Sequence, residues 1–443
     1  MAMTESNLMQ GPRPLLAGKA KLIIGGLILV ALAEMIGRVG FKLGPGQVTL
    51  LPMLWALLMA ALWGGLHRRL PGALAVSPQV QAWASAALGV GVMLFLSRMG
   101  LTVGQSLPTV IASGPALIFQ ELGHFLGTIV IGLPLALVLG MKREAVGATF
   151  SIGREGSLMI IGERYGLNSA EGRGVLGEYI TGTVLGAIFL ASFAGFLASL
   201  GVFDPRSLAM GAGVGSASLM AASLGAVMAQ TDPAQHETLT ALAATANMLT
   251  GIVGFYFTML VSLPLCSWLY HRLEPVLGRL TRRGRAPQDT EAGMEAIAAP
   301  PFGWGDRLLA WGFVVLGAAL ANHLGYGADL LQSLAGCLLL MVPVVIAAAL
   351  RQRFARFPEM IALSLMTAVV AVPGLLPAFA PLVALAAKMN FLAFTTPVLA
   401  LAGFSVARDL PVFRRLGWRI VAVSLAAEAA TFLGAVLVAE LFH

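Results

Sequence analysis

The chain has 443 residues; 58% are hydrophobic, only 11% are charged, and the net charge is +7. A water-soluble domain typically has about a quarter of its residues charged, so this composition excludes an ordinary soluble protein. The mean hydropathy of +0.85 agrees with that conclusion. We predict a polytopic membrane protein whose excess positive charge reflects topology and contact with membrane lipids, with no nucleic-acid partner.

The apolar stretches are long enough to be membrane helices. A helical span needs about 20 apolar residues, and the chain contains about thirteen candidate stretches. Since no series of short alternating strands is visible, we predict an all-α, polytopic membrane helical bundle. The expected segments are 22–40, 46–66, 80–101, 106–141, 147–163, 174–200, 207–231, 238–270, 307–323, 327–350, 356–387, 389–406 and 413–441.

The basic residues predict how the chain is oriented. Lys and Arg cluster in short loops, for example at Lys142 and Arg143, between Arg272 and Arg285, and between Arg351 and Arg356. Thirteen crossings with a cytoplasmic N-terminal segment, residues 1–21, put these clusters in the cytoplasm. No cleavable signal peptide is apparent. We expect a multi-pass protein of the bacterial cytoplasmic (inner) membrane.

A polar, Pro- and Gly-containing linker at 280–303 suggests two related halves. We assign 22–200 to a first membrane repeat, 201–237 to a Gly-rich connecting region, and 238–443 to a second repeat containing the linker. Each half holds a long Pro-broken segment followed by an interrupted one, and the predicted crossings run in opposite directions. Inverted repeats with interrupted helices are typical of secondary transporters.

The first candidate site is the interrupted stretch from Thr149 to Ser157. Thr149, Ser151 and Ser157 are polar, and Arg154 and Glu155 are charged, within an otherwise apolar segment. A helix break exposes backbone N–H groups that attract anions, and Arg154 would bind a carboxylate in a bidentate manner. Alternatively, Arg154 and Glu155 pair with each other where a cytoplasmic loop enters the span.

The corresponding stretch of the second half contains Asn390, Thr395 and Thr396, followed by Pro397. Proline removes a backbone donor and breaks a helix, so the hydroxyls and a freed carbonyl would bind substrate or Na⁺. The alternative is that each threonine bonds back to its own helix.

A dense run of small residues holds Gly213, Ser216 and Ser218. Small residues in an apolar helix usually allow close helix packing. A run this dense also suits an unwound segment that faces a ligand. The sequence leaves both interpretations open.

Residues Gln120–Phe125, QELGHF, resemble the HELGHF metal-binding stretch of intramembrane metalloproteases. Gln120 stands where the first histidine ligand would be, and one histidine does not make that zinc site. We therefore expect no metal site. Glu121 and His124 either form a structural pair, carry a coupling proton or line a cavity.

Other polar residues also lie within apolar segments. Glu178 follows the first interrupted stretch and is a further candidate for ion coupling, although a protonated helix contact would explain it equally well. Cys266 and Cys337 are expected to be buried apolar residues. The remaining members of this group are Glu34, Asn247, Asn322 and Glu428.

Two stretches carry a family resemblance. Residues 141–183, MKREAVGATFSIGREGSLMIIGERYGLNSAEGRGVLGEYITGT, and 395–423, TTPVLALAGFSVARDLPVFRRLGWRIVAV, resemble an uncharacterised bacterial family of multi-spanning membrane proteins, catalogued as a domain of unknown function. The architecture is more distantly similar to elevator-type secondary carriers such as the 2-hydroxycarboxylate and bile-acid symporter groups. That resemblance implies a homodimer with substrate held at paired helix breaks.

The leading hypothesis is a secondary active transporter of a small organic anion, a carboxylate or amino-acid derivative, coupled to H⁺ or Na⁺. Its site would form between 149–157 and 390–397, with 211–218 nearby, and Glu121, His124, Glu155 and Glu178 would be candidates for coupling. No other cofactor is expected. The alternatives are an integral membrane enzyme that uses Glu121 and His124, or a channel.

Overall fold

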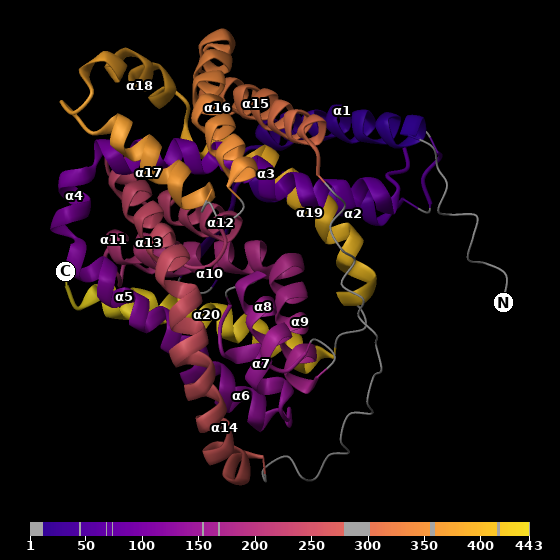
Figure 1. The fold of residues 1–443 in the computed structure, drawn as a ribbon, viewed down its shortest axis with the longest axis vertical. Coiled ribbons are helices and arrows are strands. Elements are labelled where there is room, and N and C mark those ends of the chain that lie inside the picture. Colours follow the sequence, from indigo (N-terminus) through magenta and orange to yellow (C-terminus); the bar gives the residue numbers. More distant parts are fainter. Residues whose placement is uncertain are drawn as a thin grey trace.

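The computed structural model describes residues 12–43, 46–67, 69–72, 74–152, 155–166, 169–278, 302–354, 359–413 and 417–442. This part of the chain is mostly helical, as the sequence predicts (Figure 1). The helices of its first half are α1 (Pro12–Ile36), α2 (Pro52–Gly65), α3 (Pro78–Gln105), α4 (Leu107–Ala112), α5 (Gly114–Gly127), η1 (Thr128–Gly132), α6 (Leu133–Val138), α7 (Glu144–Thr149), α8 (Glu155–Arg164), α9 (Ala170–Thr181), η2 (Gly182–Gly186), α10 (Ala187–Leu200), α11 (Pro205–Ala212) and α12 (Ala217–Met228).

The second half of the described chain is also mostly helical. Most of the linker predicted at 280–303 lies outside the described residues. The helices of this second half are η3 (Pro233–Gln235), α13 (His236–Phe257), η4 (Thr258–Ser262), α14 (Leu263–Leu277), α15 (Trp304–Tyr326), α16 (Leu330–Arg353), α17 (Glu359–Ala371), η5 (Pro377–Phe379), α18 (Ala380–Ala387), η6 (Phe391–Phe394), α19 (Thr395–Phe413) and α20 (Trp418–Glu440).

Local sequence explains where many helices begin and end. Asp204, Ser216 and Asp329 each accept a hydrogen bond from a backbone N–H in the first turn of α11, α12 and α16, respectively. Such caps satisfy donors that have no partner inside the helix. Gly201 and Gly327 end α10 and α15 with positive φ angles of 63° and 68°, a conformation that glycine adopts without strain.

One local feature departs from the all-helical prediction. Strands β1 (Val39–Leu43) and β2 (Gly46–Leu50) form an antiparallel hairpin in which Val39 pairs with Leu50. The prediction of a helix across 46–66 is therefore wrong for its first five residues, and helix α2 starts only at Pro52. Proline suits the first position of a helix because it has no N–H to satisfy there.

The helices form two packed groups, each with its own hydrophobic core (Figure 1). The small lobe consists of η1, α6–α9, η4, α14 and the first turns of α20. Phe150, Ile161 and Cys266 lie in its core. The main body contains the other helices, including α3, α10–α13 and α15–α19, around a larger core. The polypeptide therefore crosses repeatedly between two separately packed units.

Three of these crossings pass through a π-helical turn: η1, η2 and η4. Residues 128–135, TIVIGLPL, and 258–265, TMLVSLPL, share a Thr-x₄-Leu-Pro-Leu pattern. Proline lacks a backbone N–H and its ring crowds the preceding turn, which favours a wider turn just before it. Single π-helical turns of this kind are frequent at functional sites.

The described residues contain fewer candidate membrane spans than the thirteen that the sequence predicts. In the described part of the chain, seven helices are long and apolar enough to cross a membrane. An eighth results if Pro377–Ala387 and Phe391–Ala407, bent by 67°, are one span. The prediction of thirteen segments is not confirmed because several apolar stretches fold as short helices, including α7, α8, α11 and α12.

The predicted inverted repeat is not confirmed either. Residues 114–138 form one continuous span through η1. In the proposed counterpart, 357–388, the described residues form α17, η5 and the short helix α18. Similar apolar composition and prolines therefore led to different structures in the two halves.

Candidate functional site

A cavity of about 700 Å³ lies where the small lobe meets the main body. Ser151, Ser157 and Tyr179 line it from the small lobe, and Ser85 of α3 and Ser405 of α19 line it from the main body. Among the described lining residues there is no Lys, Arg, Asp or Glu. The polar groups of the wall are hydroxyls, one amide and one imidazole, set between apolar side chains.

The first predicted stretch is interrupted, as expected. Helix α7 ends at Thr149 and α8 starts at Glu155. Ser157, in the first turn of α8, is 1% exposed, and its Oγ has no hydrogen-bond partner among the described residues. Because a buried hydroxyl normally has a partner, this atom is available to a bound molecule.

The other predicted residues of this stretch have different positions. The Thr149 hydroxyl donates to Ala145 O at 2.7 Å, and the side chain packs against Cys266 away from the cavity. Arg154 lies outside the described residues, as does the side chain of Glu155. The proposed role of Arg154 therefore stays a prediction.

The Gly- and Ser-rich run is an unwound segment between α11 and α12. Gly215 has a φ of +89°, which a residue with a side chain would adopt only with strain. Asn247 of α13 holds the break, because its Nδ2 donates to Gly213 O at 2.8 Å and to Gly215 O at 3.0 Å. Ser216 caps α12, and both Ser216 and Ser218 line the cavity.

The third predicted stretch, at 390–397, does not belong to this cavity. The break lies between α18 and η6, and Thr395 and Thr396 start the regular helix α19. Asn390 Oδ1 accepts from Leu392 N, and the Thr395 hydroxyl donates to Leu392 O. Thr396 donates to Glu34 of α1 at 2.6 Å. Pro397 does not interrupt the helix, since a proline is tolerated in the first turn.

Neighbouring side chains also saturate the backbone of this break. Arg98 of α3 donates to Met389 O at 2.9 Å and to Ala387 O at 3.3 Å. Asn322 of α15 accepts from Asn390 N at 3.0 Å. The described residues of 390–397 therefore do not line the cavity that Ser151 and Ser157 line, and protein side chains bond the second half's break.

A buried polar cluster adjoins the cavity. Glu121 of α5 accepts from Gln120 Nε2 at 2.6 Å and from the Thr250 hydroxyl at 2.7 Å, and His124 Nδ1 lies 3.3 Å from its other oxygen. His124 and Thr250 line the cavity. Glu121 itself does not line the cavity, but it contacts His124 and Thr250, which do.

Two further carboxylates are buried beside the π-helical turn η2. Glu178 of α9 and Glu428 of α20 are each 1% exposed. Gly182 and Gly186 leave room for Glu428, because a Cβ at either glycine would come within 2.9 Å and 2.8 Å of its Oε1. Glu178, a predicted coupling residue, therefore lies at the boundary of the lobes but does not line the cavity.

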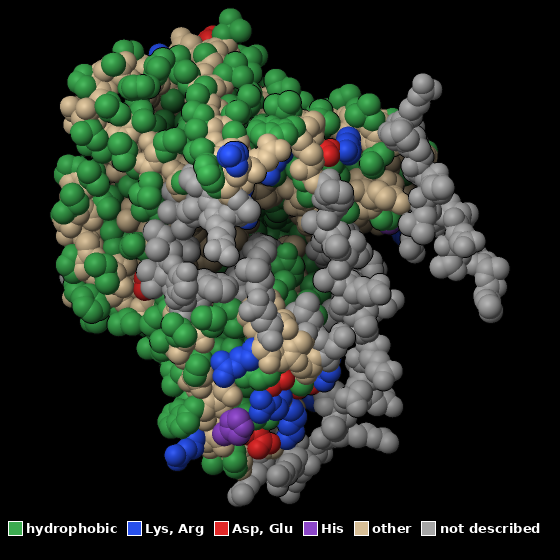
Figure 2. Space-filling view, in the orientation of Figure 1, with side chains coloured by type: hydrophobic (Ala, Val, Ile, Leu, Met, Phe, Trp, Pro, Cys, Tyr) green, Lys and Arg blue, Asp and Glu red, His purple; other side chains and the backbone are tan. Residues whose placement is uncertain are grey.

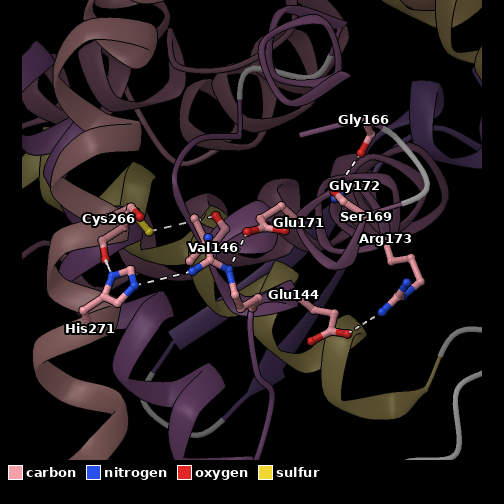
Figure 3. Close-up of polar contacts among 11 residues, drawn as sticks. Glu144, Val146, Gly166, Ser169, Glu171, Gly172, Arg173, Cys266 and His271 are labelled. Atoms are coloured by element: carbon pink, nitrogen blue, oxygen red, sulfur yellow. Dashed lines mark hydrogen bonds and ion pairs between the residues drawn. The ribbon is translucent and has the colours of Figure 1, made fainter. Parts of the chain in front are cut away.

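Charged side chains gather at the outer end of the small lobe, whereas hydrophobic side chains cover much of the main body (Figure 2). Two ion pairs link α7 and α9 reciprocally: Arg143 Nε donates to Glu171 at 2.6 Å, and Arg173 donates to Glu144 at 2.9 Å (Figure 3). The first bond raises the pKa of the Arg143 guanidinium above its ordinary value. These contacts fix the helices that present Ser151 and Tyr179.

The sequence did not single out several residues that position the site. Thr250 follows Asn247 by three residues, so both lie on one face of α13. That spacing is a signal that sequence analysis could have used. Arg98, which bonds the other break at Ala387 and Met389, was not singled out either, although a lone charge within a long apolar stretch usually has a defined partner inside the bundle. Cys266 and Cys337 are free and buried, as predicted.

Comparison with known proteins gives one family. Residues 31–272, slightly more than half of the chain, match the family described as "Protein of unknown function (DUF3100)". The match includes 141–183 and stops before 395–423, so the resemblance of the later stretch lies outside it. No curated protein and no solved structure matches the chain, which leaves the resemblance to elevator-type carriers without support. The chain therefore belongs to the DUF3100 family, whose function is unknown.

Proposed function

We propose that this protein is a secondary active transporter of a small organic anion. The observation that supports this most directly is that two interrupted segments, at 150–152 and 213–216, both reach one cavity between two packed lobes. Irregular backbone inside a membrane protein is tolerated where it lines a cavity, and carriers use such breaks to bind substrate.

The chemistry of the wall favours an anionic group on the substrate. The first turns of α8 and α12 both reach the cavity, through Ser157 and through Ser216 and Ser218. Helix N-termini present N–H groups and positive partial charge. The Ser157 hydroxyl adds a donor without another described partner. A carboxylate fits these donors, and the apolar part of the wall, including Leu96 and Met99, suits a short carbon skeleton.

The arrangement of the lobes suggests how access would alternate. In the proposed mechanism the small lobe moves as a unit against the main body, and the π-helical turns η1, η2 and η4 absorb the change. This is the form that the expected elevator-type mechanism would take here, and it needs no inverted repeat. The homodimer, the cytoplasmic N-terminus and the bacterial inner membrane remain predictions from the sequence.

A binding screen followed by transport tests the proposal. The purified protein is heated with and without a panel of monocarboxylates, dicarboxylates and amino acids, and stabilisation identifies ligands. The best ligand is then radiolabelled and offered to proteoliposomes. We expect saturable uptake that accelerates when unlabelled ligand is present inside.

Three results would contradict the carrier proposal. Flux without acceleration by internal ligand would indicate a channel. Chemical conversion of the ligand would indicate an enzyme. The absence of stabilisation by every member of the panel, together with no uptake, would remove the organic anion as substrate.

A further inference from the structure

We infer that Glu121 and His124 form a proton-binding pair that communicates with the cavity. The role of the pair in coupling rests on the proposed function. In that role H⁺ is the coupling ion and Glu121 is the group that holds it. The proton comes from water in the cavity. With a neutral imidazole and an ionised carboxylate, the pair carries a net charge of −1, and binding of one proton makes it neutral.

The geometry gives the proton a route. Glu121 is 7% exposed and does not line the cavity, whereas His124 and Thr250 do. His124 Nδ1 lies 3.3 Å from Glu121 Oε2. An imidazole has two nitrogen atoms and can accept a proton on one while it releases a proton from the other. The ring therefore connects the wall of the cavity to the carboxylate behind it.

The hydrogen bonds fit both charge states of Glu121. The Thr250 hydroxyl lies 2.7 Å from Glu121 Oε1 and 3.0 Å from Ala246 O, but it has a single proton to donate. When Glu121 is ionised, the hydroxyl donates to it. When the proton resides on Oε2, that oxygen donates to His124 Nδ1 and the hydroxyl keeps its bond to Oε1. When the proton resides on Oε1, that oxygen donates to the hydroxyl, which donates to Ala246 O instead. Protonation thus leaves no buried donor of this pair without an acceptor.

Gln120 provides a second adjustable contact. Its side chain is fully buried, its Nε2 donates to Glu121 Oε1 at 2.6 Å, and its Oε1 has no partner within the described chain. Rotation of the amide exchanges its oxygen and nitrogen, which have nearly the same size. The oxygen would then accept from a protonated Glu121.

Helices α4, α11, α13, α20 and η4 pack against α5. None of the described titratable side chains on these helices lines the cavity. These residues are Arg206, which pairs with Asp204; His236, which contacts Thr231 O; Glu237, which lies in electrostatic range of Arg98; Glu428, beside η2; Glu440, which accepts from Asp204 N; and Arg419, in the first turn of α20.

Infrared difference spectroscopy of the purified protein across a pH series tests the inference without any substrate. A protonated carboxyl has a carbonyl band that a carboxylate lacks. We expect a titrating band in the unaltered protein, its loss in Glu121→Gln, and a displaced pH midpoint in His124→Gln, because coupled groups titrate together. Glu34→Gln, which removes a buried carboxylate distant from the cavity, should leave this midpoint unchanged.

The inference fails if Glu121→Gln retains the same titrating band, or if His124→Gln leaves the midpoint where it was. A binding screen without hits would argue against the anion carrier but would leave the infrared result intact, so the two proposals fail separately. If both hold, proteoliposomes with Glu121→Gln should exchange the labelled ligand across the membrane but lose accumulation driven by a pH gradient.

Discussion

Two helix breaks in this protein are held in the same way and have different surroundings. At 213–216, Asn247 donates to the carbonyls of Gly213 and Gly215. At 388–390, Asn322 donates to Lys388 O at 3.4 Å and accepts from Asn390 N. The first break opens on a cavity, and the second is covered by packed helices and by Arg98.

The comparison shows that an interrupted membrane helix is not by itself a binding site. A broken helix frees backbone groups, and burial of a free polar group costs roughly 1–3 kcal/mol. At the second break the protein supplies partners for these groups, including a guanidinium. At the first break, within the described chain, the amide of Asn247 donates to the carbonyls, and Ser216 and Ser218 line the cavity. The difference lies in the neighbouring helices, since both breaks have an asparagine.

The largest effect is expected from removal of the charge that closes the second break. Arg98→Met leaves the carbonyls of Ala387 and Met389 without their donors, and should lower the free energy of unfolding by about 3 kcal/mol. Thermal unfolding in detergent measures this loss. Arg206→Met, which removes a partly exposed ion pair with Asp204, is the control and should cost about 0.5 kcal/mol. Equal stability of the two variants would contradict the structural role of Arg98.

The two asparagines allow a direct test of the difference between the breaks. Asn247→Leu and Asn322→Leu should each destabilise the protein by about 2 kcal/mol, because each leaves buried backbone groups unsatisfied. Only Asn247→Leu should also weaken binding of a carboxylate found in the screen, by roughly tenfold. Titration of that ligand, followed by its thermal stabilisation, provides the measurement. Equal binding by both variants would mean that the 213–216 break takes no part in recognition.

Ser157→Ala separates binding from stability. The Ser157 hydroxyl has no partner in the described residues, so its removal should change the free energy of unfolding by less than about 0.5 kcal/mol. Binding of the same carboxylate should weaken roughly tenfold, which corresponds to about 1.4 kcal/mol. Unchanged affinity, measured by the same titration, would exclude this hydroxyl from the site.

The smallest effect is expected at Thr396, a predicted site residue next to the second break. Thr396→Val removes the hydrogen bond to Glu34 while keeping the shape of the side chain, and should cost about 1 kcal/mol of stability. Ligand affinity should stay the same, since Thr396 does not line the cavity. A loss of affinity as large as that of Ser157→Ala would return 390–397 to the binding site.

Parts of this picture could be predicted from the sequence because they depend on composition and local chain properties. The low charge content requires a membrane protein, and long apolar runs in a membrane favour helices. Glycine and serine between Gly211 and Ser218 disfavour a continuous helix, and the stretch around Ser151 does the same. Burial of both cysteines follows from their apolar neighbours.

Only the tertiary structure decided which of these local features meet. Asn390, Thr395 and Thr396 are polar, as Ser157 is, but Asn322 and Glu34 of other helices bond Asn390 and Thr396. Arg98 bonds the carbonyl of Met389 just before them. The small lobe and its π-helical turns likewise depend on how α14 packs on α6 and α7. The hydrogen-bonded partners lie 68 to 362 residues apart in the chain. A pattern within one segment carries no information about which helix will face it.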